Sequence, residues 1–274
     1  MARMARMHAD DDQDRPVDLL RNLRTLVELD TWFGVETLPK PASDESAPAS
    51  PSTRSGSDPA AAPVKPAPPK AEPVPDPVAD LPTAGEPQDL LRAVAERIAS
   101  CQRCGLCAKR STTVPGEGNP QPEVLFIGEG PGADEDRQGR PFVGAAGQLL
   151  DKMIVAMGFA REQVFIANVV KCRPPGNRNP EPEEIAACLP YLDRQIDILK
   201  PKVICTLGNV PLRALRGEGP GITRARGTAF EYRGYQVIPT FHPSYLLRNE
   251  AAKKPCWQDL QAVLTAIGRE PPGR

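Results

Sequence analysis

Short runs of consecutive apolar residues alternate with longer amphipathic stretches in the second part of the chain. The runs are VLFI at residues 124–127, VFIAN at 164–168, VICTL at 203–207 and VIPTF at 237–241. Runs of this length that are apolar at nearly every position are typical of parallel strands buried on both faces. The sequence therefore predicts a central parallel sheet of four strands.

Apolar residues at helical spacing mark the stretches that separate these runs. Residues 149–157 place five apolar side chains on one face of a helix. Further helices are predicted at residues 89–100, 182–199, 210–215 and 257–267. Strands that alternate with helices predict an α/β domain, here a three-layer sandwich in which helices flank the sheet.

The first third of the chain has a different composition. Much of the 33-proline content lies in residues 39–86, a Pro/Ala/Ser-rich segment almost without large apolar residues. Such a segment cannot bury enough surface to offset its chain entropy, so we expect a disordered linker. Residues 16–33 carry an apolar stripe at helical spacing, which predicts a short helix that docks on the folded part, is transient, or binds a protein partner. We divide the chain into a tail (1–38), the linker and a folded domain (87–274).

Charge divides along the same boundary. Residues 1–86 hold 9 of the 34 Lys and Arg and 15 of the 35 Asp and Glu, which leaves 25 and 20 in the remainder. The predicted folded domain is therefore basic, with a net charge of +5, although the whole chain carries −1. This balance is compatible with DNA binding without requiring it.

No segment of the sequence suggests export or contact with a membrane. The opening stretch MARMARMHADDDQD lacks an apolar segment, and no run of 18 apolar residues occurs. We expect a soluble, cytoplasmic monomer. Its 7 cysteines, an odd number, then favour metal ligation or free thiols over a disulfide framework.

A glycine-rich acidic loop, GEGPG at residues 128–132, follows the first predicted strand. In an open α/β sheet this is the carboxyl edge, where ligands bind, and glycines let a ligand approach the backbone closely. The loop matches neither the dinucleotide fingerprint nor the P-loop, and its acids make it a poor phosphate site. A tight turn with solvated acids is the alternative interpretation.

The cysteines fall into two groups. Residues 101–107 form a C-x2-C-x2-C run, and Cys172 and Cys188 bracket a loop rich in proline and asparagine. Cys205 lies in an apolar run and is expected to be a small buried hydrophobe, while Cys256 is isolated. Four thiolates suit either a structural zinc ion or a 4Fe-4S cluster, and the spacing does not decide between them.

Several motifs occur together in order: the GEGPG loop, Phe142, Asn168, VKCRPP at residues 170–175 and FHPS at 241–244. With them the chain resembles the family 4 uracil-DNA glycosylases, the iron–sulfur type, over about residues 89–267. The resemblance implies a monofunctional hydrolase that flips uracil out of single- or double-stranded DNA, cleaves its N-glycosidic bond and starts base-excision repair.

The resemblance also implies a 4Fe-4S cluster and its ligands. The positions that match the family's ligands are Cys101, Cys104, Cys172 and Cys188. Cys107, the third cysteine of the run, stands where no ligand is expected, so it departs from the family pattern.

The uracil-binding residues implied by the resemblance are Phe142, which stacks on the base, Asn168, which reads its edge, and His242. Gly130 matches the position next to the flipped base where other uracil glycosylases carry a water-activating Asp. The chemistry agrees, because a flipped base needs an aromatic face and polar groups for its edge. A donor such as His242, aimed at uracil O2, stabilises the departing anion.

Two acids are implied to take the place of that Asp. They are Glu129 and Glu135, and Asn177 matches the amide that orients Glu135. A carboxylate near C1′ stabilises the cationic sugar and orients water. Beyond FHPS, the stretch PSYLLR suggests an apolar wedge with a basic flank. We expect Leu246 to fill the space that the flipped base leaves and Arg248 to contact a phosphate.

Two other functions remain open at this point. One is the related subclass that becomes covalently attached to uracil-DNA; its Arg-rich insert with a histidine is missing here, because residues 139–145 run straight through. The other is a non-catalytic zinc- or cluster-bearing module that binds nucleic acid. No lysine nucleophile occurs in the motifs, so we expect no lyase step.

Overall fold

A six-stranded sheet forms the centre of the computed structural model, which describes residues 76–271. Its strands are β1 (Glu117–Gly118), β2 (Val124–Gly128), β3 (Phe165–Asn168), β4 (Val203–Leu207), β5 (Phe230–Tyr232) and β6 (Tyr235–Thr240), in the order β1-β3-β2-β4-β6-β5. The four inner strands are parallel, which confirms the prediction from the apolar runs. The two edge strands are antiparallel and were not predicted. They are too short, and exposed on too many positions, to give an apolar run.

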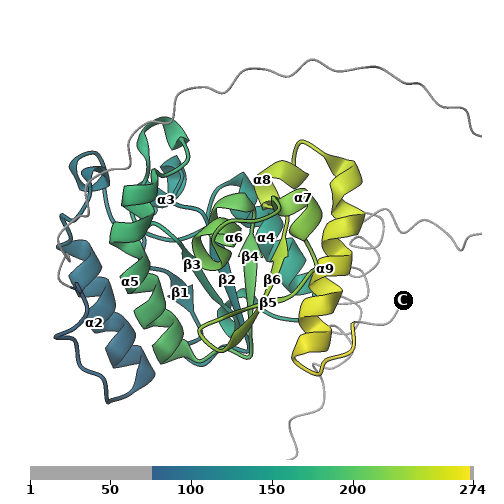
Figure 1. Ribbon diagram of the computed structural model, residues 1–274, viewed down its shortest axis with the longest axis horizontal. Coiled ribbons are helices and arrows are strands. Elements are labelled where there is room, and N and C mark those ends of the chain that lie inside the picture. Colours follow the sequence, from purple (N-terminus) through teal and green to yellow (C-terminus); the bar gives the residue numbers. More distant parts are fainter. Residues whose placement is uncertain (1–75, 272–274) are drawn as a thin grey trace, which may run out of the picture.

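Helices cover both faces of this sheet (Figure 1). One face carries α2 (Pro87–Ala99) and α5 (Pro182–Leu199), and the other carries α4 (Ala145–Ala156) and α9 (Lys253–Ala266). Shorter helices are α3 (Ala133–Gln138), α6 (Asn209–Arg216), α7 (Ile222–Ala225) and α8 (Pro243–Leu246). Single 3-10 turns lie at Gly105–Ala108, Arg161–Gln163, Pro175–Asn177 and Glu250–Ala252. The three-layer sandwich is therefore confirmed.

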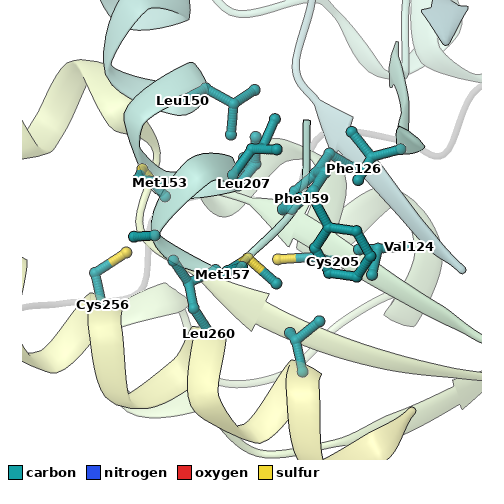
Figure 2. Packing of buried hydrophobic residues seen from close by; sticks show 14 of the residues in the cluster. Val124, Phe126, Leu150, Met153, Met157, Phe159, Cys205, Leu207, Cys256 and Leu260 are labelled. Carbon is teal, nitrogen blue, oxygen red and sulfur yellow. The ribbon is translucent and has the colours of Figure 1, made fainter. Parts of the chain in front are cut away.

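The alternating direction of strand side chains divides the core into two clusters. From β2, Val124 and Phe126 pack toward α4 and α9, in the cluster drawn in Figure 2. Leu125 and Ile127 pack on the opposite face, toward α2 and α5. Because helices cover both faces, each position of β2 must be apolar. Each large side chain buried in this way contributes about 1.5–3 kcal/mol to folding.

Residues 76–86, the end of the predicted linker, lie against α2. Arg97 donates to Asp80 Oδ1 and Oδ2, at 2.9 and 2.8 Å, and to the carbonyl of Pro77. The folded part thus starts before residue 87, the boundary that the sequence predicted. The tail helix at residues 16–33 and the linker up to residue 75 lie outside the described residues. None of the helices between residues 76 and 271 is both long and apolar enough to span a bilayer.

Candidate active site

A cleft of about 670 Å³ opens at the carboxyl ends of the parallel strands. Its wall contains the GEGPG loop after β2, the end of β3, the loop after β4 and the segment after β6. Eight predicted site residues line it: Glu129, Gly130, Glu135, Phe142, Asn168, Asn177, His242 and Arg248. The parallel sheet brings them together because each inner strand ends at the same edge.

Phe142 occupies an unusual backbone conformation. Its φ is +51°, in the left-handed region that a residue with a bulky side chain rarely adopts. The Phe142 ring is buried, and its centroid lies 5.6 Å from the centroid of the His242 ring. Two glycines make room for it: a Cβ on Gly147 would lie 1.9 Å from the Phe142 carbonyl oxygen, and one on Gly128 would lie 2.5 Å from the ring. Gly128 and Gly147 thus leave the space that the Phe142 ring and backbone need.

Asn168 ends β3 and sits beside Gly128 in the parallel ladder. Its side chain is buried, yet its Oδ1 accepts no hydrogen bond from any residue that the structure describes. An unmet buried acceptor costs about 1–3 kcal/mol, and most buried polar groups in folded proteins have a hydrogen-bond partner. Asn168 therefore presents an acceptor ready for a donor that enters the cleft.

His242 is oriented by Ser244. The His242 Nδ1 atom accepts the backbone N–H of Ser244 at 3.1 Å and lies 2.7 Å from its hydroxyl. An accepting Nδ1 leaves the ring proton on Nε2, the nitrogen free to serve a ligand. Burial, helped by the nearby positive charge of Arg248 and opposed by Glu135, lowers the pKa of His242 to about 4. The imidazole is therefore a neutral donor at physiological pH.

The two acids of the cleft have different surroundings. Glu135 accepts from the backbone N–H groups of Gly132 at 3.1 Å, Val143 at 2.9 Å and Gly144 at 3.0 Å, so its carboxylate holds the loop together. No hydrogen bond or ion pair of the described residues engages the Glu129 carboxylate, and burial raises its pKa. Glu129 is therefore the acid better placed to engage water or substrate.

The predicted contact between Asn177 and Glu135 does not form among the described residues. The Asn177 side chain instead accepts from Arg173 Nε at 2.8 Å. Asn177 has a φ of +55° and is exposed, so its turn carries the amide toward Arg173 at the rim. Gly130 lines the cleft, and a Cβ at this position would lie 2.6 Å from Val170 Cγ2, so any side chain here would require Val170 to shift.

The side chain predicted to act as the wedge lies in the core and not at the surface. Leu246 is fully buried in the core on the side of α8 that faces α4, whereas Leu247 is 49% exposed. Both leucines follow the same motif, so the sequence alone could not tell which one faces the core. Arg248 is exposed and lines the cleft.

Five cysteines line a separate cavity between α2, α5 and the segment after β3. They are Cys101, Cys104, Cys107, Cys172 and Cys188. Arg110 Nη1 lies 3.2 Å from the Cys172 sulfur, and the backbone N–H of Lys171 lies 3.3 Å from that of Cys188. In the described part of the chain, no three His, Cys, Asp or Glu side chains are grouped closely enough to hold a single metal ion. Five thiols from three segments of the chain, two of which accept N–H groups, are the kind of donors that an iron–sulfur cluster uses.

Comparison with protein families identifies the fold. Residues 115–261, more than half of the chain, match the model of the uracil DNA glycosylase superfamily. The chain belongs to this superfamily.

Individual relatives within the superfamily show which of its families the chain resembles most. A type-4 uracil-DNA glycosylase of Sulfurisphaera tokodaii is 48% identical over 184 residues, which cover 64% of this chain and 84% of that protein. One of Thermotoga maritima is 46% identical over 187 residues, 67% of this chain and 97% of that protein. A type-5 uracil-DNA glycosylase of Pyrobaculum aerophilum is 28% identical over 61% of this chain and 88% of its own. The resemblance to family 4 is confirmed.

Three residues of this superfamily member were given no role of their own from the sequence. Ser244 orients His242, Arg110 contacts a cysteine sulfur, and Arg161 donates to the Phe142 carbonyl. Ser244 could have been noticed, because a hydroxyl two residues after a histidine is suited to a local hydrogen bond. The partners of the arginines lie 62 and 19 residues away, so no local pattern reveals them.

The lowered pKa of His242 predicts a particular pH dependence for this glycosylase fold. Protonation favours the unfolded state, in which histidine titrates near 6.5, so stability is lost as the pH falls from about 6.5 to about 4. Urea unfolding across this range should show a shallower pH slope for His242→Gln than for the wild type. Equal slopes would mean that His242 titrates normally in the folded protein.

Proposed function

We propose that this chain is a type-4 uracil-DNA glycosylase that hydrolyses the N-glycosidic bond of uracil in DNA, leaves an abasic site and so starts base-excision repair. The single observation that carries the proposal is the unpartnered, buried Oδ1 of Asn168 in a cleft that also contains Phe142 and a neutral His242. Superfamily membership and the type-4 relatives support it.

The base-binding half of the cleft follows from these three side chains. A base inside a duplex must leave the stack, and Phe142 offers the aromatic face that replaces its neighbours. Asn168 accepts from uracil N3–H with Oδ1 and donates to O4 with its amide nitrogen. His242 donates from Nε2 toward O2, where negative charge develops as the bond to the sugar breaks. A neutral histidine makes this bond without a buried positive charge.

We assign to Glu129 the role of the acid that faces the sugar in the cleft. Its carboxylate is half-buried, lies next to Gly130 and is not consumed by hydrogen bonds within the described chain. It would orient water toward C1′ and stabilise the cationic sugar. Glu135, proposed from the resemblance for the same task, acts through the loop that it caps, and Asn177 contributes at the rim.

We further propose that Cys101, Cys104, Cys172 and Cys188 bind a 4Fe-4S cluster. The thiols converge on one cavity from segments far apart in the sequence, and Arg110 and Lys171 supply N–H groups to two of the sulfurs. When bound, such a cluster would join α2, the segment after β3 and α5 through iron–thiolate bonds. Cys107 lines the same cavity, in the 3-10 turn Gly105–Ala108.

The remaining proposals concern the whole chain. We propose that it acts as a cytoplasmic monomer on single- or double-stranded uracil-DNA, and that residues 1–38 form a tail that binds a protein partner. The opposite charges of residues 1–86 and 87–274 support a division of roles between the two parts.

One assay tests the function directly. A labelled oligonucleotide that contains one uracil is incubated with the protein, treated with alkali and analysed on a denaturing gel, beside the same strand with thymine. Alkali-dependent cleavage at uracil alone supports the proposal. A band shifted by covalently attached protein indicates the trapping relative, and DNA binding with no uracil release indicates a passive binding module. Either result overturns the proposed activity.

The exposed Leu247 replaces Leu246 as the proposed wedge, and it gives a prediction. Leu247→Ala should slow uracil release from double-stranded DNA about tenfold and from single-stranded DNA little, because only a duplex has a gap to fill. Val155→Ala is a matched control, since Val155 is 44% exposed on α4 and lies outside the cleft. Equal losses on both substrates would remove the wedge role.

A further inference from the structure

The backbone of Phe142 contacts the guanidinium of Arg161, a group that has no role in the chemistry proposed above. Arg161, at the start of the 3-10 turn before β3, donates from Nη1 to the Phe142 carbonyl at 3.3 Å and from Nη2 to the Pro141 carbonyl at 2.6 Å. These carbonyls belong to the two peptide groups on either side of the left-handed residue Phe142. A bulky residue persists at positive φ only where its surroundings fix it, so these two bonds bear directly on where the ring points.

The other donors of Arg161 are engaged as well. Its Nε and Nη2 donate to Glu117 Oε1 at 3.1 and 2.8 Å, and its Nη1 donates to Asp151 Oδ1 at 2.5 Å. Together with the two carbonyls, this makes five bonds for the five N–H groups of a guanidinium. The fork is planar and rigid, so the positions of its partners are fixed relative to one another.

The anchoring carboxylates come from different layers of the fold. Glu117 lies on the edge strand β1 and Asp151 on α4, and Arg140 also donates to Glu117 Oε2 at 2.8 Å. Burial would raise the pKa of Glu117, but the hydrogen bonds from Arg140 and Arg161 outweigh it and leave the pKa lowered. Glu117 therefore stays ionised, and the Arg161 side chain is only 16% exposed.

We propose that Arg161 is the positioning residue for the base-stacking ring: it joins β1 and α4 to the backbone of Phe142 and so fixes the face on which uracil lies. The inference rests on the proposed function, because it takes Phe142 as the stacking residue. In this proposal the short edge strand β1 positions Glu117, which binds Arg161.

The test starts from Arg161→Lys, which keeps the charge but has three donors in place of a five-donor fork. Single-turnover uracil release should fall about tenfold, and inhibition by free uracil should weaken by a similar factor, since about 1.4 kcal/mol corresponds to tenfold. Affinity for uracil-free DNA should not change. Arg97→Lys is the matched control, because Arg97 also joins a carboxylate to a backbone carbonyl but lies outside the cleft.

A double-mutant cycle with Phe142→Ala separates positioning from general stability. If Arg161 acts through the ring, Arg161→Lys should add little further loss in the Phe142→Ala background. If the losses in uracil release caused by the two substitutions add fully, this inference alone is overturned. The same holds if Arg161→Lys releases uracil at the wild-type rate while Phe142→Ala is slow. Wild-type release by Phe142→Ala would instead overturn the proposed pocket. Thermal unfolding monitors each variant, and Glu117→Gln replaces Arg161→Lys in the cycle if the latter does not fold.

Discussion

Asn168→Asp is expected to lose about 1–3 kcal/mol of discrimination in favour of uracil, the scale of an unmet buried polar contact. The substitution removes the donor to uracil O4 and sets a carboxylate oxygen against it. The same carboxylate can accept from the amino group of cytosine, so the ratio of cytosine to uracil release should rise.

Single-turnover release from matched uracil and cytosine oligonucleotides measures this change. Asn119→Asp serves as the control, because it makes the same change from amide to carboxylate at a residue outside the cleft. If Asn168→Asp keeps the wild-type rate on uracil, Asn168 does not read the base. The pocket built on Phe142 and His242 would then have to be redrawn.

Cys172→Ala is expected to abolish the cluster and with it much of the stability of the fold. Purified wild type should be yellow-brown and hold about four iron atoms per chain, as a 4Fe-4S cluster requires. Without this ligand, a bound cluster would no longer link the segment after β3 to α2 and α5. Iron content and visible absorbance should fall to near zero, and the soluble yield should drop.

Cys107→Ala provides the matched comparison for this prediction. Cys107 lines the same cavity, but the family pattern does not make it a ligand, so colour and iron content should be retained. A colourless, zinc-loaded wild type would refute the cluster outright. Loss of iron in Cys107→Ala, with retention in Cys172→Ala, would reassign the ligands.

Much of the fold could be predicted from the sequence because burial leaves a local pattern. A strand covered on both faces must be apolar at nearly every position, and the run from Val124 to Ile127 satisfies this. The predicted bounds of β4 and α5 agree with the structure for the same reason. The edge strand at Glu117–Gly118 has only two residues and one exposed position, so it left no pattern to find.

The cleft was predictable in outline, since residues that follow parallel strands meet at one edge of the sheet. The family resemblance, and not the position of the strand ends, pointed to Asn168 and His242, and both residues line the cleft. Which carboxylate is free is a different question. Glu129 lies in the GEGPG loop and Glu135 lies six residues later in α3, and only the folded protein shows that three backbone N–H groups bind the Glu135 carboxylate.

The sequence by itself determined the layers of the fold and the four parallel strands, because hydrophobic periodicity and the succession of strands and helices are properties of the chain. Tertiary structure decided which of two adjacent leucines faces the core, since Leu246 and Leu247 differ only in the way that α8 packs against α4. It also decided what fixes Phe142. Arg161 joins partners from β1, α4 and the loop before Phe142, and bonds between such distant segments exist only once the layers have assembled.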